Sequence, residues 1–342
     1  MAELTLEDIA KQVGVSRSTV SRVVNGSPNV SDDVRIKVLS AIQETGFHPN
    51  AAARSLASQR TRMIGLVIPG SVKTFFTDPF FPQLIQGIAC GCNNNDLSLS
   101  FFLVGNKDDE KKILPRIAKS GMLDGVLIQS GLPGDPLVEQ IIASRIPSVM
   151  LGRPEGLDEI SFVDVDNIEA AAKATQHLIS LGYERIGTIT GKKGNVVTHD
   201  RLEGYRKAFA NNNRTVEKAL IAGGDFSEIG GYDAMKALLP SKPDAVFAAS
   251  DLMAAGAIRA VLETGLRVPE DIAFVGFDDI PLESVMKIPL TTIRQPIKKL
   301  GIKAVEVLID LIENGKSPAR QFVLETELVV RESCGAKIKR FE

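Results

Sequence analysis

The feature that most constrains the fold is a series of short apolar segments that begins at Met63 and alternates with stretches of helical length. The eight strand candidates are MIGLVI (63–68), LSLSFFLV (97–104), GVLIQ (125–129), SVMLG (148–152), FVDVD (162–166), RIGTIT (185–190), AVFAAS (245–250) and IAFVGF (272–277). The clearest helical stretches between them are 82–95, 167–181, 202–212 and 252–264. Strands that alternate with helices predict an α/β fold in which helices cover both faces of parallel sheets.

The length of the chain adds a second constraint. A chain of 342 residues is too long for one ordinary core, and eight βα units at this spacing are too many for one compact domain. We therefore expect two similar α/β lobes. No apolar run approaches the ~20 residues needed to cross a bilayer, and the start, MAELTLEDIAKQ, lacks the basic and apolar regions of a signal peptide. The sequence thus predicts a cytoplasmic protein without a membrane partner.

The first 48 residues predict a separate head of three short helices. Thr5 can cap a helix at 6–13, with Asp8 at its third position, and Ser16 can cap a second helix at 17–24. Ser31 can cap a third helix, which Gly46 ends. Apolar residues form one stripe on the first helix and another on the second, at helical spacing, and Gly14 permits a tight turn between them. This is the layout of a helix-turn-helix.

The second of these helices has a defined outer face. With its valines inward, Arg17, Ser18, Ser21 and Arg22 point outward, because residues four apart share a face. In a recognition helix such residues reach base edges in the major groove, where arginine can pair with guanine and serine can serve several bases. The alternative is a small helical domain with two solvated arginines. Residues 1–62 carry eight Lys or Arg against six Asp or Glu, so DNA contact through the head alone is compatible with the net charge of −2.

The segment TLEDIAKQVGVSRSTVSRVVNG (5–26) resembles the opening of the lactose-repressor and galactose-repressor family of bacterial regulators. HPNAAARSLA (48–57) resembles that family's hinge helix, and FVGFDD (274–279) and LTTIRQP (290–296) resemble parts of its core. The resemblance extends over essentially the whole chain. It implies an all-α helix-turn-helix head at 1–48, a hinge helix and linker at 49–62, and a two-lobed, periplasmic-binding-protein-like α/β core with parallel sheets at 63–335.

The same resemblance implies how DNA is bound. Arg17, Ser18 and Arg22 correspond to base-reading positions, and Leu56 corresponds to a hinge leucine that wedges into the minor groove, where an apolar side chain can part a base step and bend the duplex. The alternative places Leu56 against its own head. The expected partner is a near-palindromic, double-stranded operator bound by a homodimer, which would associate with the nucleoid. The residues expected to contact DNA are Thr5, Ser16, Arg17, Ser18, Thr19, Ser21, Arg22, Asn25, Asn50, Ala53 and Leu56.

Polar side chains follow the ends of several predicted strands, and open parallel sheets bind ligands at that edge. Carboxylates, arginines and amides that converge there suit a polyhydroxylated effector, above all a sugar, whose apolar face a phenylalanine can cover. The resemblance assigns effector contacts to Arg201, Asp251, Asp278 and Gln295. Gly152 departs from members that have an acidic side chain there, which leaves the identity of the ligand open. The residues expected to bind the effector are Asp78, Phe80, Phe81, Arg153, Asp200, Arg201, Asp251, Asp278 and Gln295.

Several of these residues have a purely structural alternative. Asp251 could serve only as the cap of a helix that begins at Leu252, and Asp278 and Asp279 could only form a turn. Phe80 and Phe81 could belong to the core or to a dimer contact. Asp200 and Arg201 could pair with each other.

The sequence therefore predicts a sequence-specific DNA-binding transcriptional regulator, a repressor whose operator affinity depends on a small polar effector, with no cofactor and no metal. A transporter's solute-binding protein would explain the core but not the head. A sugar-processing enzyme is disfavoured because the common phosphate-binding, dinucleotide-binding and nucleophile-elbow motifs do not occur in the sequence. Cys90, Cys92 and Cys334 are odd in number and contain no C-x-x-C pair, so we expect inert thiols.

Overall fold

The computed structural model describes residues 4–24, 27–47, 60–69, 72–119, 121–156, 159–282, 287–315 and 318–336. The chain divides into two units, Met1–Arg62 and Met63–Glu342. The first unit has its own small apolar core, and the second, which we call the core unit, has four larger apolar clusters. None of the helices among these residues is long and apolar enough to cross a membrane.

The head contains helices α1 (Leu6–Val13), α2 (Arg17–Val24) and α3 (Asp32–Thr45), the first two with the bounds that the sequence predicts. Thr5 and Asp8 form the expected reciprocal cap of α1, and Ser16 Oγ accepts a hydrogen bond from the Thr19 amide at 3.1 Å. The expected cap at Ser31 is wrong in one respect. Ser31 precedes α3 but its side chain makes no capping hydrogen bond, and the acidic residues of the first turn are left to complement the helix dipole.

The core unit consists of two lobes, each built on a six-stranded sheet. The sheet of lobe 1 has the order β11-β5-β4-β3-β1-β2 and is parallel throughout. Its strands are β1 (Met63–Pro69), β2 (Ser98–Val104), β3 (Gly125–Ile128), β4 (Ser148–Leu151), β5 (Ser161–Val165) and β11 (Gln321–Leu324). Its helices are α5 (Val72–Thr77), α6 (Phe80–Asn93), α7 (Lys107–Ala118), α8 (Pro136–Ala143) and α13 (Ile297–Asn314).

The sheet of lobe 2 has the order β12-β10-β9-β8-β6-β7, and only the edge strand β12 runs antiparallel to its neighbour. Its strands are β6 (Ile186–Thr190), β7 (Ile221–Gly223), β8 (Ala245–Ala248), β9 (Ala273–Asp278), β10 (Thr291–Arg294) and β12 (Glu327–Val329). Its helices are α9 (Asn167–Ser180), α10 (Val196–Asn211), α11 (Glu228–Leu238) and α12 (Asp251–Glu263), with short 3-10 turns η1 (Lys218–Leu220) and η2 (Leu239–Ser241).

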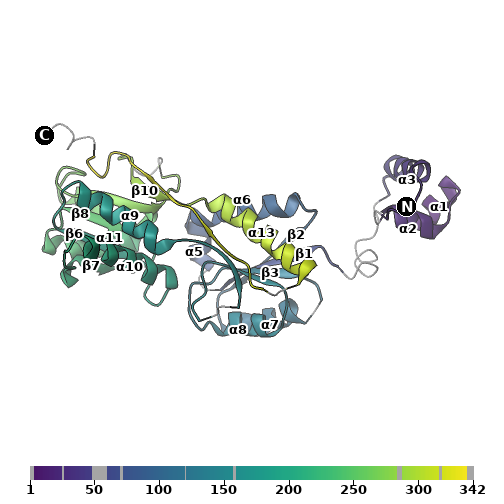
Figure 1. The fold of residues 1–342 in the computed structure, drawn as a ribbon, viewed down its shortest axis with the longest axis horizontal. Coiled ribbons are helices and arrows are strands. Elements are labelled where there is room, and N and C mark those ends of the chain that lie inside the picture. The colour runs from purple at the N-terminus through teal and green to yellow at the C-terminus, as the bar shows by residue number, and fades with distance from the viewer. Residues whose placement is uncertain are drawn as a thin grey trace. The chain divides into compact units, whose positions relative to one another are not determined.

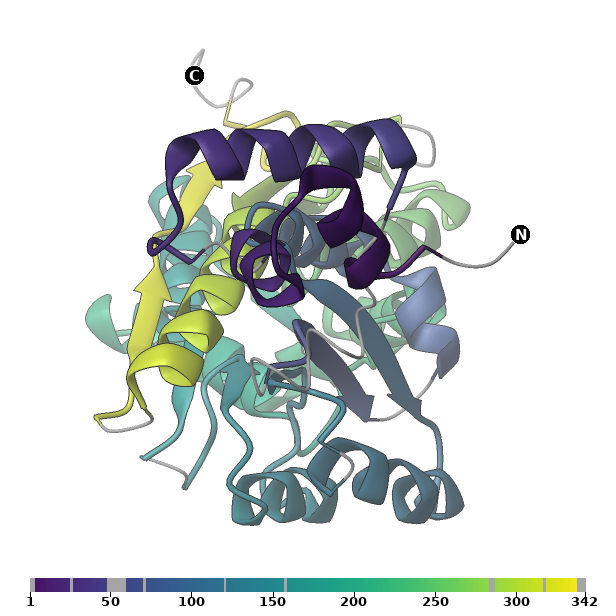
Figure 2. The ribbon, with the colours of Figure 1, turned by 90° about the vertical axis from the view of Figure 1, so that its right-hand side faces the viewer.

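Helices cover both faces of each sheet. In lobe 1, α6 and α13 share one apolar cluster with the sheet, and α7 and α8 share another. Figures 1 and 2 show α7 and α8 on the side of this sheet away from α13. In lobe 2, α11 and α12 pack on one face, and α9 and α10 pack on the other. The expected α/β architecture with two lobes is therefore confirmed.

The chain passes between the lobes at three places: from β5 to α9, from β10 to α13, and from β11 to β12. Lobe 1 thus combines residues 63–165 with 297–324, and lobe 2 combines 166–296 with 327–336. The segment that follows β6 contacts the segment that follows β3 of the other lobe. The amide of Val196, in lobe 2, donates to the carbonyl of Gly131, in lobe 1, at 2.9 Å.

Candidate functional site

The outer face of α2 carries the polar residues that the sequence predicts there. Val20 and Val23 are buried in the head, whereas Arg17, Ser18 and Arg22 are exposed. Arg17 Nε lies 3.8 Å from Glu7 Oε1, but both side chains are about two-thirds exposed, so this pair leaves the guanidinium open to a stronger partner. Ser16 Oγ lies 2.8 Å from the hydroxyl oxygens of both Ser18 and Thr19, which fixes the first turn of the helix.

The remaining expected DNA contacts divide between described and undescribed parts of the chain. Thr5 is exposed at the start of α1, and Thr19 and Ser21 are half-buried on α2. Asn25, Asn50, Ala53 and Leu56 lie outside the described residues. The proposed DNA contacts of these four residues remain predictions.

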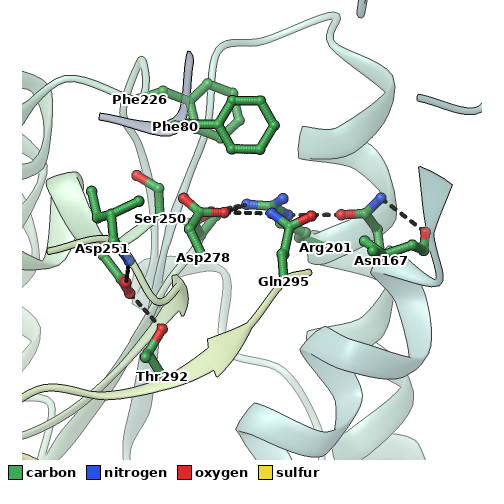
Figure 3. Close-up of polar contacts among 12 residues, drawn as sticks. Phe80, Asn167, Arg201, Phe226, Ser250, Asp251, Asp278, Thr292 and Gln295 are labelled. Atoms are coloured by element: carbon green, nitrogen blue, oxygen red, sulfur yellow. Dashed lines mark hydrogen bonds and ion pairs between the residues drawn. The ribbon is translucent and has the colours of Figure 1, made fainter. Parts of the chain in front are cut away.

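A row of hydrogen-bonded polar side chains joins residues that are far apart in the sequence (Figure 3). We call this row the polar cluster; it consists of Asn167, Arg201, Asp278 and Gln295. Asn167 begins α9, Arg201 lies in α10, and Asp278 ends β9. All four residues are buried. The predicted sheet edge therefore does bring Arg201, Asp278 and Gln295 together.

Arg201 is the centre of the polar cluster. Its Nε donates to Asn167 Oδ1 at 3.0 Å, and its Nη1 donates to the carbonyl of Ala249 at 2.5 Å and lies 3.5 Å from Asp278 Oδ1. Its guanidinium carbon also lies 3.6 Å from the centre of the Phe277 ring, a cation–π geometry. Burial lowers the pKa of Arg201, and the neighbouring carboxylates oppose that shift. Arg201 pairs with Asp278 across the site, so the alternative in which it pairs with Asp200 is wrong.

Asp278 combines a strained backbone with a place in the polar cluster. Its backbone φ of 119° and the φ of 59° at Asp279 are both in the region that disfavours residues with a side chain. Such strain persists where the surrounding structure holds it, and it is common at binding sites. The Asp278 carboxylate accepts from Gln295 Nε2 at 2.6 Å, and burial raises its pKa to about 7. Asp278 therefore does more than shape the backbone after β9, and its contact with an effector remains a prediction.

Two aromatic rings lie on the same side of the polar cluster, those of Phe80 and Phe226 (Figure 3). Phe80 begins α6 of lobe 1, and Phe226 precedes α11 of lobe 2. Phe80 and Phe81 also pack against the apolar cluster of lobe 1, with their ring centres 5.6 Å apart. The interpretation of both residues as core contacts is therefore confirmed, and Phe80 in addition presents its ring toward the polar cluster.

Asp251 has a different environment from the other expected effector contacts. Ser250, not Asp251, caps α12 by accepting from the Met253 amide, so the capping alternative for Asp251 is wrong. The Asp251 carboxylate instead accepts from Thr292 Oγ1 at 2.5 Å and from the Ile280 amide at 3.1 Å. Burial raises its pKa well above the ordinary value. Through these contacts Asp251 links the loop that follows β9 to strand β10. In Figure 3 the contacts lie apart from the polar cluster.

Arg153 and Asp200 form an ion pair between the lobes. Arg153 Nη2 lies 2.7 and 2.9 Å from the two carboxylate oxygens of Asp200. The Arg153 amide donates to Asp164 Oδ2 at 2.8 Å, and Asp164 also accepts from the Asn167 side chain. Because Asn167 in turn binds Arg201, and Arg201 follows Asp200 in α10, these residues form a closed ring of contacts that links the ion pair to the polar cluster.

Asp78 lies close enough to the polar cluster to influence its charge. Its carboxylate accepts from the Phe80 amide at 2.9 Å, at the start of α6. Burial raises the pKa of Asp78, and Arg201 opposes the shift. The Asp78 charge in turn raises the pKa of Asp278. Lobe 1 therefore contributes a carboxylate to a site whose other polar groups come mainly from lobe 2.

Asn167 is one of the polar residues that follow predicted strands, in this case the strand at 162–166, and its position indicates a place at the site. Two residues that the sequence analysis does not select also take part in this arrangement: Asp164 and Phe226. Asp164 lies inside that strand, where its buried carboxylate gives no sign of a polar role. Phe226 has a positive φ of 70° and lies in a segment without a predicted element, so nothing in the local pattern indicates its position.

Comparisons with known proteins agree with this arrangement. Residues 5–50 match the model of bacterial regulatory proteins of the lacI family, and residues 175–334 match a periplasmic binding protein-like domain. The HTH-type transcriptional regulator CelR of Thermobifida fusca is 40% identical over 334 residues, which cover 96% of this chain and 98% of the relative. A CelR–cellobiose complex has a TM-score of 0.77 at 36% identity, with 96% and 99% of the two chains covered. A lac repressor dimer bound to operator and the anti-inducer ONPF has a TM-score of 0.82 at 28% identity, with 97% and 99% covered.

Proposed function

Because the chain belongs to the lacI family of bacterial transcriptional regulators, we propose that it binds a near-palindromic operator as a homodimer and changes its operator affinity when a small sugar binds between the lobes of its core. Its relatives are regulators and not enzymes. On this proposal the protein acts at the nucleoid, where its operator lies. The proposed domains are the head at 1–48, the hinge helix and linker at 49–62, and the ligand-sensing and dimerisation core at 63–335.

The exposed face of α2 carries the proposal for DNA binding. Arg17, Ser18 and Arg22 project from a helix whose valines are buried, so they are available to base edges when the helix enters the major groove. Thr5, Ser16, Thr19 and Ser21 lie near enough to serve the phosphate backbone or the flanking bases. Asn25, Asn50, Ala53 and Leu56 are proposed to contact the operator as well, with Leu56 as a wedge in the minor groove, as the sequence resemblance implies.

The polar cluster carries the proposal for the effector. A guanidinium, a carboxylate and two amides in one row offer both donors and acceptors to a ligand with several hydroxyls. The Phe80 ring lies to one side, where it can cover an apolar sugar face. Similarity to a protein solved with cellobiose supports a β-glucoside as the first ligand to test. Asp78, Phe81, Arg153, Asp200 and Asp251 are proposed to shape the same site.

Operator binding tests the proposal directly. The full-length protein is mixed with DNA fragments selected from random sequence, and binding is measured by fluorescence anisotropy with and without cellobiose and other neutral sugars. We expect tight, sequence-dependent binding that at least one sugar changes by tenfold or more, in the range of ordinary allosteric coupling. Binding that is equal for selected and random DNA would refute the regulator assignment. Sequence-specific binding that no sugar alters would refute only the effector assignment.

A further inference from the structure

The ion pair between Arg153 and Asp200 balances one positive charge in the region around the polar cluster. The Arg153 side chain is 49% exposed, so it is accessible, whereas the Asp200 side chain is only 6% exposed. Both carboxylate oxygens of Asp200 contact the same guanidinium nitrogen. The hydrogen bond that Arg153 donates to the Asp200 carboxylate is also the main reason that the pKa of Arg153 is raised. Arg153 therefore reaches the other lobe, where the Asp200 carboxylate already balances its positive charge.

Arg201 likewise already has polar partners within the protein. Its Nε and Nη1 donate to the Asn167 amide oxygen, the Ala249 carbonyl and the Asp278 carboxylate, and the residue is 5% exposed. An incoming anion would compete with these partners for the positive charge of Arg201. Among the described residues of this region, both guanidiniums thus have a partner before a ligand arrives.

Three further carboxyl groups also make the region around the two guanidiniums unfavourable for a negatively charged ligand. Asp78, Asp164 and Asp278 lie near the two guanidiniums, and burial raises the pKa of each of them, which reports an environment that resists further negative charge. A phosphorylated or carboxylated ligand would add charge to this environment. A neutral hydroxyl instead donates to a carboxylate and accepts from an amide, and it adds no charge.

We propose that Asp200 is a specificity-determining residue, an inference that rests on the proposed sugar site. Because Asp200 balances the charge of Arg153, the site between the lobes binds an uncharged sugar and rejects the phosphorylated or carboxylated form of the same sugar. Free arginines bind phosphate through two parallel hydrogen bonds and are the usual means of recognising it. Asp200 balances the charge of the Arg153 guanidinium and binds its Nη2, so Asp200 competes with a phosphate for this guanidinium.

Calorimetric titration of the full-length protein tests this with matched ligand pairs. The pairs are cellobiose with cellobiose 6′-phosphate, and glucose with glucose 6-phosphate. For the native protein we expect the neutral member of the binding pair to bind at least about tenfold more tightly than its phosphate. Stronger binding of the phosphate would overturn the inference and leave the proposed sugar response intact. The absence of binding by any member of a wider sugar panel would overturn both.

Asp200→Asn should convert this preference. The substitution preserves the shape of the side chain and releases the Arg153 charge, so the ratio of the affinity for the phosphorylated sugar to that for the neutral sugar should rise at least about tenfold. The matched control is Glu217→Gln, which makes the same change in net charge but frees Arg185, outside the proposed site. This control should leave both affinities unchanged.

The double variant Arg153→Gln, Asp200→Asn assigns the gain to one group. It should lose the phosphate affinity that Asp200→Asn acquires, because the guanidinium is no longer present. A folded Asp200→Asn protein that binds the neutral sugar but gains no phosphate affinity would overturn the inference, and so would a gain that persists in the double variant. Thermal unfolding of each variant establishes that it is folded before titration.

Discussion

The ring of Phe226 occupies the space in which a side chain at position 191 would lie: a Cβ on Gly191 would approach Phe226 Cζ to 2.0 Å. Gly191 directly follows β6, and Phe226 reaches it from the segment between β7 and α11 with a strained φ of 70°. Glycine at 191 therefore determines where this aromatic ring sits relative to the polar cluster.

Gly191→Ala should displace the Phe226 ring and weaken binding of the effector. We expect the sugar affinity to fall roughly two- to tenfold, the range that an aromatic contact supplies, with operator affinity in the absence of sugar unchanged. Gly187→Ala is the matched control, since Gly187 lies in β6, which Gly191 follows, and its Cβ would meet nothing closer than 3.5 Å. Calorimetry with the identified sugar gives the comparison. Equal sugar affinities in the two variants would mean that the ring does not contact the ligand.

Arg201→Ala should abolish sugar binding without abolishing operator binding. Arg201 holds Asn167 and Asp278 in place, whereas the surface of α2 lies in a separate unit of the chain. Because effector and DNA affinities are linked only through differential binding, loss of the sugar fixes operator affinity at its ligand-free value. Anisotropy titrations with and without sugar report this directly. Asp278→Asn, which retains the side-chain shape, should give the same result, and a normal sugar response in either variant would show that the effector binds elsewhere.

Arg22→Ala should weaken operator binding by roughly 1–3 kcal/mol per half-site and relax the preference at one base pair. The reason is its exposed position on the outer face of α2. Competition binding against a set of operators, each changed at one position, measures both effects. Lys37 is exposed on α3 and offers a comparison. Lys37→Ala should weaken binding to specific and random DNA equally, or leave both affinities unchanged. If Arg22→Ala behaved as Lys37→Ala does, a base-reading role for Arg22 would be wrong.

Leu56→Ala should reduce operator affinity and operator bending together. This prediction comes from the sequence resemblance alone, in which an apolar side chain parts a base step at the centre of the operator. Fluorescence energy transfer between the ends of a labelled operator reports the bend. The sugar affinity of the protein without DNA should not change. An unaltered bend would exclude the wedge.

Burial of Asp278 should make the core less stable as pH rises. Its pKa is raised to about 7 in the folded protein, so between pH 4 and pH 7 the folded state binds a proton that the unfolded chain has lost. The unfolding free energy therefore falls as pH rises through that window, with a slope of about one proton. The pKa values of Asp78 and Asp164 are raised as well and contribute in the same direction. Denaturant unfolding at pH 5, 6, 7 and 8 measures the slope.

Asp278→Asn should make this slope shallower by about one proton. Asp271→Asn is the comparison, because the Arg267 side chain holds the pKa of Asp271 at about 2, and its contribution is lost only as pH falls toward that value. Between pH 5 and pH 8 the Asp271→Asn slope should equal that of the native protein. An unchanged slope in Asp278→Asn would assign the pH dependence to other groups.

Local patterns predict the head well, since its helices are defined by caps and stripes within a few residues. Thr5, Gly14 and Ser16 act in the structure as the sequence indicates. Strands with uninterrupted apolar runs are predicted equally well. The strand β10, with the sequence TTIR, is missed because its threonines look polar, although Thr291 and Thr292 are fully buried and hydrogen-bonded. The edge strands β7, β11 and β12 have three or four residues each and carry too little pattern.

The strand pattern predicts a site residue only where a polar residue ends a recognised strand. Asp278 follows this rule, because parallel strands bring their carboxyl ends to one edge. Gln295 follows β10, which the pattern misses, so Gln295, like Arg201, is assigned by the family resemblance. The Arg153–Asp200 pair depends instead on how closely the two lobes approach, which no periodicity along the chain records. For the same reason, the sequence analysis considers pairing of Asp200 with its neighbour Arg201 and misses the partner that lies 47 residues earlier.

The three passages between the lobes bear on how the protein folds during synthesis. Helix α13 contributes seven buried residues to the main apolar cluster of lobe 1, yet it is made after all of β1–β5 and after most of lobe 2. A nascent chain that has emerged from the ribosome only as far as β10 exposes one apolar face of the lobe 1 sheet, with α6 its main cover on that face. Lobe 1 therefore completes its core only near the end of translation, and ribosome-bound chains halted before α13 should be the ones that chaperones hold and proteases cleave.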